Sequence, residues 1–246
     1  MVKLNSVVKF LNRELKIKSI KDESKNGLQV RASNEIKKVG LSVDACMDVF
    51  EQARKLNCDL IIVHHGLFWK GAKGAEILTK PKVKFLKKNK ISVYAAHLPL
   101  DKHFKYGNNV MLFKMLSIKP KEIFDEVGYL GYLKKTRNVN SIAKELESKL
   151  DARCKVWRLG KIKIRKLAIV SGSGGRSISE AVKKKVDLLI TGEISHGSYR
   201  LAKDARLSMI TAGHYKTETV GVKEVGRLLE KKFNLKTVFI DNPTGM

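Results

Sequence analysis

The sequence predicts an α/β protein made of two interlocked lobes, each with a mostly parallel or mixed sheet. Short apolar runs of strand length alternate with amphipathic helical patterns along nearly the whole chain. The 246 residues allow one large or two small domains, and 43% hydrophobic residues are enough to form a core. The alternation breaks once, at residues 119–139, which we interpret as a crossing between a lobe at 1–125 and a lobe at 126–246.

The first lobe opens with a charged amphipathic helix and continues with alternating strands and helices. KVGLSV and DLIIV are apolar runs typical of buried strands, and the segment between them has one apolar face, as a helix covering a sheet should have. We place the next helix start at Pro81, because the first turn of a helix tolerates proline. The predicted strands are residues 38–43, 59–63 and 91–96, and the later helices cover 45–56, the segment after Pro81, and 108–118.

The second lobe repeats this order of elements. RKLAIVS, VDLLIT and SMITA are apolar runs of strand length, each followed by a segment with helical periodicity. The predicted helices are 141–150, 178–185, 198–205 and 217–233, and the strands are 165–171, 186–191, 208–212 and 236–240. The last strand has no fixed assignment, because it can join the sheet of the first lobe instead.

The chain is strongly basic, with 50 Lys and Arg against 24 Asp and Glu and a formal net charge of +26. Residues 1–125 and 126–246 each carry 25 basic and 12 acidic residues, so the charge is not confined to an appended arm. Two interpretations remain: a surface that binds polyanions such as DNA or RNA, or a lysine-rich composition adapted to heat or salt. No motif for base-specific readout is visible, so any nucleic-acid binding should be non-specific.

The sequence predicts a cytoplasmic protein. No apolar run approaches the roughly 20 residues that a membrane span needs, and we expect no secretory signal at the start of the chain. The three cysteines form no CxxC pair, which argues against a disulfide framework and against a thiolate zinc site.

Histidines and carboxylates follow the predicted strands, and five of the six histidines lie just past a strand end. Because parallel strands bring their carboxyl ends to one edge of the sheet, these side chains should gather there. Imidazole with carboxylate suits zinc, iron, manganese or nickel, and the number of donors exceeds the needs of one four-coordinate ion. The sequence therefore predicts two divalent metal ions. The donors considered are His64, His65, His97, Asp101, Glu193, His196, His214 and Glu218.

Adjacent His64 and His65 should point to opposite sides if the strand continues through them. A weaker candidate is the SGSGG segment, where the backbone of Ser171, Gly172, Ser173 and Gly174 could hold a phosphate; a flexible turn is the alternative. The segment 66–74 places Phe68 and Trp69 between glycines, as a mobile lid or as a subunit contact.

Several segments together resemble the NIF-three-like family, also called GTP cyclohydrolase I type two homologues. HHG at 64–66, HLPLD at 97–101 and GHYKTE at 213–218 resemble its three signature segments. Further matches follow in the same order along the chain: NGLQV at 26–30, SGSGG at 171–175, TGEISH at 191–196 and FIDNP at 239–243. The length agrees with the short form of the family, which lacks a middle insertion.

The resemblance implies a two-lobed α/β subunit, a dinuclear metal centre and a toroidal homohexamer. It implies that the metal ligands are His64, His65, Asp101, His214 and Glu218. His97 would then support the ligands without binding metal, and Glu193 and His196 would lie near the substrate.

Three functions remain open at this stage. The first is metal-dependent hydrolysis, for example ring opening in a nucleotide such as GTP, by a metal-bound water. The second is a ring that binds nucleic acid or protein partners and uses its metals structurally or for regulation. The third is a metal-delivery chaperone, which predicts exchangeable metal and no turnover.

Overall fold

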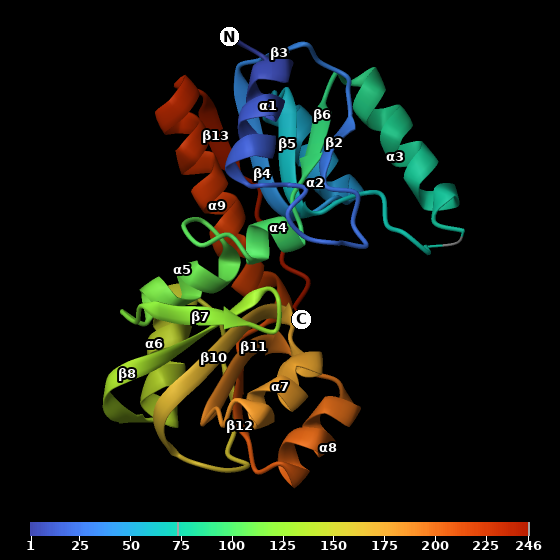
Figure 1. Ribbon diagram of the computed structural model, residues 1–246. Helices are drawn as coiled ribbons and strands as arrows, with labels where there is room; N and C mark the ends of the chain where they lie inside the picture. Colours follow the sequence, from blue (N-terminus) through green and yellow to red (C-terminus); the bar gives the residue numbers. More distant parts are fainter. Residues whose placement is uncertain (73, 246) are drawn as a thin grey trace. The chain divides into compact units, whose positions relative to one another are not determined.

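The computed structural model describes residues 1–72 and 74–245, which form two compact units, each built on its own sheet (Figure 1). Unit 1 comprises Met1–Leu100 and Gly221–Asn242, and unit 2 comprises Asp101–Val220 and Pro243–Met246. The division thus falls after Leu100 and again after Val220, whereas the sequence suggested a single division between residues 125 and 126.

Unit 1 contains a five-stranded sheet in the order β13-β4-β5-β6-β2. Strands β13, β4, β5 and β6 run parallel, and β2 pairs with β6 in the antiparallel sense. A separate pair, β1 (Val2–Lys3) with β3 (Glu35–Ile36), is antiparallel. The sheet strands are β2 (Gly27–Val30), β4 (Lys38–Asp44), β5 (Leu60–His65), β6 (Ser92–Ala95) and β13 (Lys236–Phe239).

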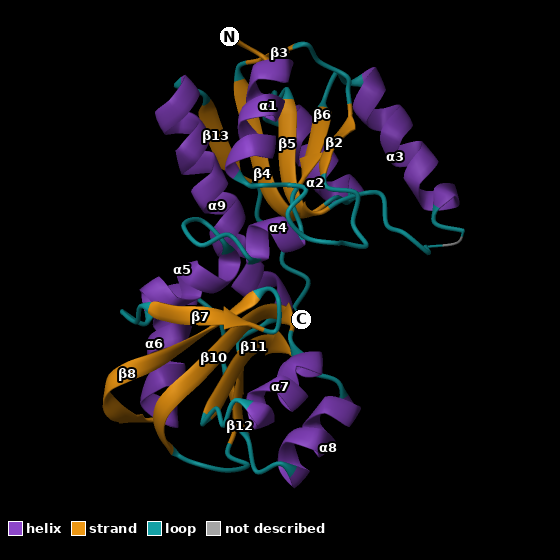
Figure 2. Ribbon diagram, viewed as in Figure 1, coloured by secondary structure: helices purple, strands orange, loops and turns teal. Residues whose placement is uncertain are grey.

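Helices cover both faces of this sheet (Figure 2). Alternate residues of β5 face opposite ways: Leu60 and Ile62 pack in one core cluster, Ile61 and Val63 in another. The first cluster includes side chains of α1 (Leu4–Glu14) and α9 (His214–Phe233), and the second includes side chains of α2 (Met47–Lys55) and α3 (Glu76–Lys88).

Unit 2 contains a six-stranded mixed sheet in the order β7-β8-β10-β11-β12-β9. Its centre, β10, β11 and β12, is parallel, and the flanking strands are antiparallel to their neighbours. The strands are β7 (Pro120–Phe124), β8 (Gly128–Asn138), β9 (Lys155–Trp157), β10 (Lys163–Ser173), β11 (Leu188–Glu193) and β12 (Ser208–Thr211).

The helices of unit 2 also lie on both faces of its sheet. One core cluster joins α5 (Asn108–Met115) and α6 (Val139–Leu150) to the sheet, and the other joins α7 (Ile178–Lys183) and α8 (His196–Asp204). Two short helical segments complete the chain, α4 (Leu98–Asp101) and the 3-10 turn η1 (Gly175–Ser177). Local signals fix some ends: the Asn138 side chain caps α6, and Ser195 caps α8 through a 3.1 Å bond from the Ser198 N–H.

The predicted α/β class with mixed sheets is confirmed, and two local predictions are wrong. Residues 119–139 are not a plain crossing: they form the antiparallel pair β7 and β8. Helix α3 begins at Glu76 rather than at Pro81. Pro81 removes the bond that its backbone N–H would donate to the carbonyl of Ile77, a residue that is 77% exposed. Lys73, in the predicted loop 66–74, lies outside the described residues.

Among the helices in the described part of the chain, none combines the length and the apolar character that crossing a bilayer requires.

Candidate metal-binding sites

Three histidines meet at the carboxyl edge of the sheet in unit 1. His64 and His65 are the last two residues of β5, and His97 comes two residues after the end of β6. Each offers a ring nitrogen within 4.8 Å of the others, and the ring centroids lie 4.8 to 5.6 Å apart. This arrangement matches the prediction that strand ends gather the histidines, and it places His97 with the other two as a candidate metal donor.

Hydrogen bonds fix the rings of His64 and His65. His64 Nδ1 lies 2.9 Å from the carbonyl oxygen of Ala96, and His65 Nδ1 lies 2.8 Å from Asp44 Oδ1. The expectation that the two side chains point to opposite sides is wrong, since their ring centroids are 4.8 Å apart. At the end of the strand these hydrogen bonds, rather than the pleat, orient the rings.

His97 is held by Asp22, which precedes β2 in the chain. Its Nδ1 lies 2.9 Å from Asp22 Oδ1, and its backbone N–H donates to Asn26 Oδ1. Burial alone would raise the pKa of Asp22, but hydrogen bonds from His97 and Asn26 hold that pKa well below its usual range. Asp22 is therefore an ionised acceptor that fixes the orientation of the His97 ring.

In all three histidines, Nδ1 faces a carbonyl or carboxylate oxygen of the protein. A carbonyl or ionised carboxylate oxygen accepts hydrogen bonds only, so Nδ1 carries the proton in each neutral ring. Nε2 then carries the lone pair, which is the state in which imidazole binds metal. Metal-binding histidines in proteins usually donate their second N–H to such an oxygen.

Unit 2 gathers a second set of donors at the carboxyl edge of its own parallel strands. His214 begins α9 and lies between two carboxylates: its Nδ1 is 2.9 Å from Glu193 Oε1, and its Nε2 is 3.2 Å from Glu218 Oε2. Burial alone would lower the pKa of His214, but the bonds to Glu218 and Glu193 raise it to about 9. The two carboxylates thus favour a positive charge at this position, which a proton or a bound metal ion can supply.

Gly172, in the irregular end of β10 between Val170 and Ser173, leaves the space in which Glu218 and His214 lie. Its backbone is left-handed, with φ +62°, and a Cβ at this position would lie 2.2 Å from Glu218 Oε1 and 3.2 Å from His214 Nε2. Only glycine fits here without moving these two side chains.

Asp101, at the end of α4, is the third carboxylate of unit 2 and is buried. Its Oδ1 accepts hydrogen bonds from Asn108 Nδ2 at 2.8 Å and from Ser171 Oγ at 2.9 Å. Two donors on the same oxygen fix the direction of the carboxylate.

The SGSGG segment uses its backbone within the protein. The N–H groups of Ser171, Gly172 and Gly174 donate to the side-chain oxygens of Asn109, Thr217 and Thr191, respectively. These three N–H groups therefore have no donor left for a phosphate, while Ser173 ends β10 in an exposed position. His196 is also exposed, as the first residue of α8.

Both donor sets fit divalent metal ions by their chemistry. Unit 1 offers oriented imidazole nitrogens, and unit 2 offers imidazole with the carboxylates of Asp101, Glu193 and Glu218. Zinc, iron, manganese and nickel all accept such mixtures.

Sequence reasoning missed Asp44 and Asp22. Asp44 could have been found, because it directly follows the predicted strand 38–43, as the histidines follow theirs. Asp22 lies in a segment without periodicity and comes within 2.9 Å of His97 only through the fold.

Comparison with known proteins now adds a family. The sequence profile of Duf34/NIF3 (NGG1p interacting factor 3) matches residues 2–245. The chain belongs to this family. A protein of Pyrococcus abyssi named GTP cyclohydrolase 1 type 2 homolog is 44% identical over 246 residues, covering 98% of each chain.

Solved structures agree with this assignment to the Duf34/NIF3 family. The structure of protein ybgI, described as of unknown function, has a TM-score of 0.93 and 30% identity and covers 100% of both chains. TTHA1606 from Thermus thermophilus has a TM-score of 0.90 and 35% identity, again over 100% of both chains. The family resemblance inferred from the motifs is thereby confirmed.

Contacts between two of these motifs explain a glycine of this Duf34/NIF3 chain. In HHG, a Cβ on Gly66 would lie 2.2 Å from Gln29 Nε2, the side chain of NGLQV. Gln29 cannot easily move, because its amide accepts from Leu67 N and donates to the Lys25 carbonyl. The two motifs therefore form one packed unit beside the histidines.

Proposed function

We propose that this protein binds two divalent metal ions through His64, His65, Asp101, His214 and Glu218. One observation carries the proposal: the Nδ1 atoms of His64, His65, His97 and His214 each face a protein oxygen at 2.8 to 2.9 Å. Histidines that bind metal usually have their second ring nitrogen held in this way, which fixes the ring and directs Nε2 to the ion.

The proposed chemistry is hydrolysis of a nucleotide such as GTP, in keeping with the name of the Pyrococcus abyssi relative. A bound divalent ion would supply a water of lowered pKa. In this proposal Asp44 and Asp22 orient His65 and His97, and Glu193 fixes His214 and accepts protons near the substrate. His196 would contact the substrate from the start of α8.

Metal content tests the ligand assignment. Elemental analysis should find about two ions per chain in the parent protein and a loss of at least one in His65→Ala and in Glu218→Ala. His196→Ala is the matched control, because its side chain is exposed, and it should keep the parent's metal content. Undiminished metal in both ligand variants, with circular dichroism unchanged, would contradict the assignment.

Activity separates the hydrolase from the other functions. Metal-loaded protein should change the ultraviolet absorbance of GTP as its purine ring opens, and chelator-treated protein should not. Full metal occupancy without turnover would favour a scaffold or a metal chaperone; rapid exchange of the bound metal with a chelator would then identify the chaperone.

A second candidate function is non-specific binding of DNA or RNA, favoured by the net charge of +26 and its equal distribution over both halves of the sequence. Contacts would go mainly to phosphates, so affinity should fall with a log–log salt slope of about −0.9 per phosphate contact on duplex. A labelled oligonucleotide and its scrambled version should bind equally. No binding at micromolar protein in about 0.15 M salt, which is the physiological ionic strength, would exclude this function.

A further inference from the structure

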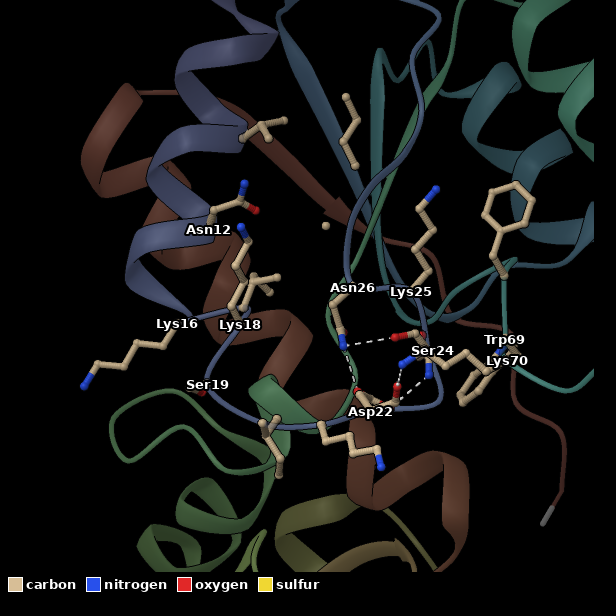
Figure 3. A pocket seen from close by; sticks show the side chains of 17 residues that line it. Asn12, Lys16, Lys18, Ser19, Asp22, Ser24, Lys25, Asn26, Trp69 and Lys70 are labelled. Carbon is tan, nitrogen blue, oxygen red and sulfur yellow. Dashed lines mark hydrogen bonds between the residues drawn. The ribbon is translucent and has the colours of Figure 1, made fainter.

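Unit 1 contains a large cavity next to the three histidines (Figure 3). Its volume is about 930 Å³, within the range of sites that hold small molecules. Figure 3 shows Asn12, Lys16 and Lys18 on one side, Trp69 and Lys70 on the other, and the segment with Asp22 and Ser24 between them. None of the proposed metal ligands lines this cavity.

The lining is strongly basic. Five lysines line it, against the single carboxylate of Asp22 among its described residues: Lys16, Lys18, Lys21, Lys25 and Lys70. Asp22 is occupied by the protein itself, since its oxygens accept from Ser24 N, His97 Nδ1, Asn26 Nδ2 and Leu98 N. The net field inside the cavity therefore favours an anion.

The rest of the lining suits a flat ring. Phe68 and Trp69 are half-buried and form one wall.

We propose that this cavity binds a small molecule that combines a phosphate or polyphosphate group with a planar aromatic ring. Lysines of the lining contact the phosphates, and Trp69 and Phe68 pack against the ring. Such a ligand would lie close to the histidines, because the Trp69 ring is 4.9 Å from that of His97. The proposal stands on the cavity alone and holds whether or not metal is bound.

Tryptophan fluorescence provides a local readout. The chain has two tryptophans, Trp69 and Trp157, so Trp157→Phe leaves Trp69 as the single reporter in the cavity wall. In chelator-treated full-length Trp157→Phe protein, GTP should quench this fluorescence. Inorganic triphosphate lacks the ring and guanosine lacks the phosphates, so each should bind at least tenfold more weakly than GTP.

Charge reversal with a matched control tests the lysines. In the Trp157→Phe background, Lys18→Glu with Lys21→Glu should weaken GTP binding at least tenfold. Lys231→Glu with Lys232→Glu changes the net charge equally, on exposed positions of α9 that do not line the cavity, and should change binding less than twofold. Circular dichroism of both double variants verifies folding.

Three results would overturn the proposal. Equal weakening by the two double variants would show a general charge effect. Equal affinity for GTP and inorganic triphosphate would remove the ring from the assignment. Binding that appears only after metal is added would show that the ions, and not the lysines, hold the phosphates. Absence of bound metal from the parent protein, with GTP binding intact, would contradict the metal proposal alone.

Discussion

Gly172→Ala is a sensitive perturbation of the unit 2 donor set. The new methyl group would meet Glu218 Oε1 at 2.2 Å and His214 Nε2 at 3.2 Å, on a backbone with φ +62°. A left-handed non-glycine residue costs about 1–2 kcal/mol, and forcing a methyl group into packed space costs about 1–3 kcal/mol. We therefore expect a loss of roughly 2–5 kcal/mol in the free energy of unfolding.

The assay is thermal unfolding followed by circular dichroism on chelator-treated protein, together with metal analysis. For a chain of this size about 1 kcal/mol corresponds to 2–4 °C, so the Tm of Gly172→Ala should fall by roughly 4–20 °C. Because Glu218 and His214 must both move, the variant should also carry less metal than the parent.

Gly197→Ala is the matched control in the same unit. Gly197 lies in the first turn of α8, and its Cβ would meet only Ser195 Oγ, at 3.8 Å. Alanine is the better helix former, so this variant should be more stable by about 0.4–1 kcal/mol and keep its metal. A Tm of Gly172→Ala within about 2 °C of the parent, with metal content unchanged, would refute the reasoning.

Three further predictions concern stability and assembly. Gly66→Ala should lower the Tm, because its methyl group would displace the Gln29 side chain; an unchanged Tm would contradict this. Burial alone would raise the pKa of Asp187, but bonds from Lys161 and from the N–H groups of Lys166 and Arg165 hold it below its usual value. Asp187→Asn should therefore cost about 1.5–3 kcal/mol at pH 7, and this difference from the parent should shrink below about pH 3.9, where the unfolded carboxyl takes up its proton; a cost independent of pH would argue against the depressed pKa. Light scattering should return about six times the 27.7 kDa chain mass, and a monomer mass would contradict the hexamer.

Local sequence patterns determined most of the framework of this protein. Apolar runs such as DLIIV and VDLLIT predicted the central strands, because a strand buried on both faces must be apolar throughout. The order of strands and helices then implied parallel pairing, which brings strand ends to one edge. That rule placed His64, His65 and His97 together in unit 1, and likewise His214 with Glu193 in unit 2.

Tertiary structure decided what no local pattern encodes. Strand β13 pairs with β4, where Lys236 lies opposite Lys38 from nearly 200 residues earlier, because it completes the core of unit 1. Asp22 reaches His97 from 75 residues away, and segment 16–28 brings its lysines to the cavity beside Trp69. Periodicity records which face of an element is buried, but a loop has no period, and the position of its charges is fixed only by packing and hydrogen bonds within the folded unit.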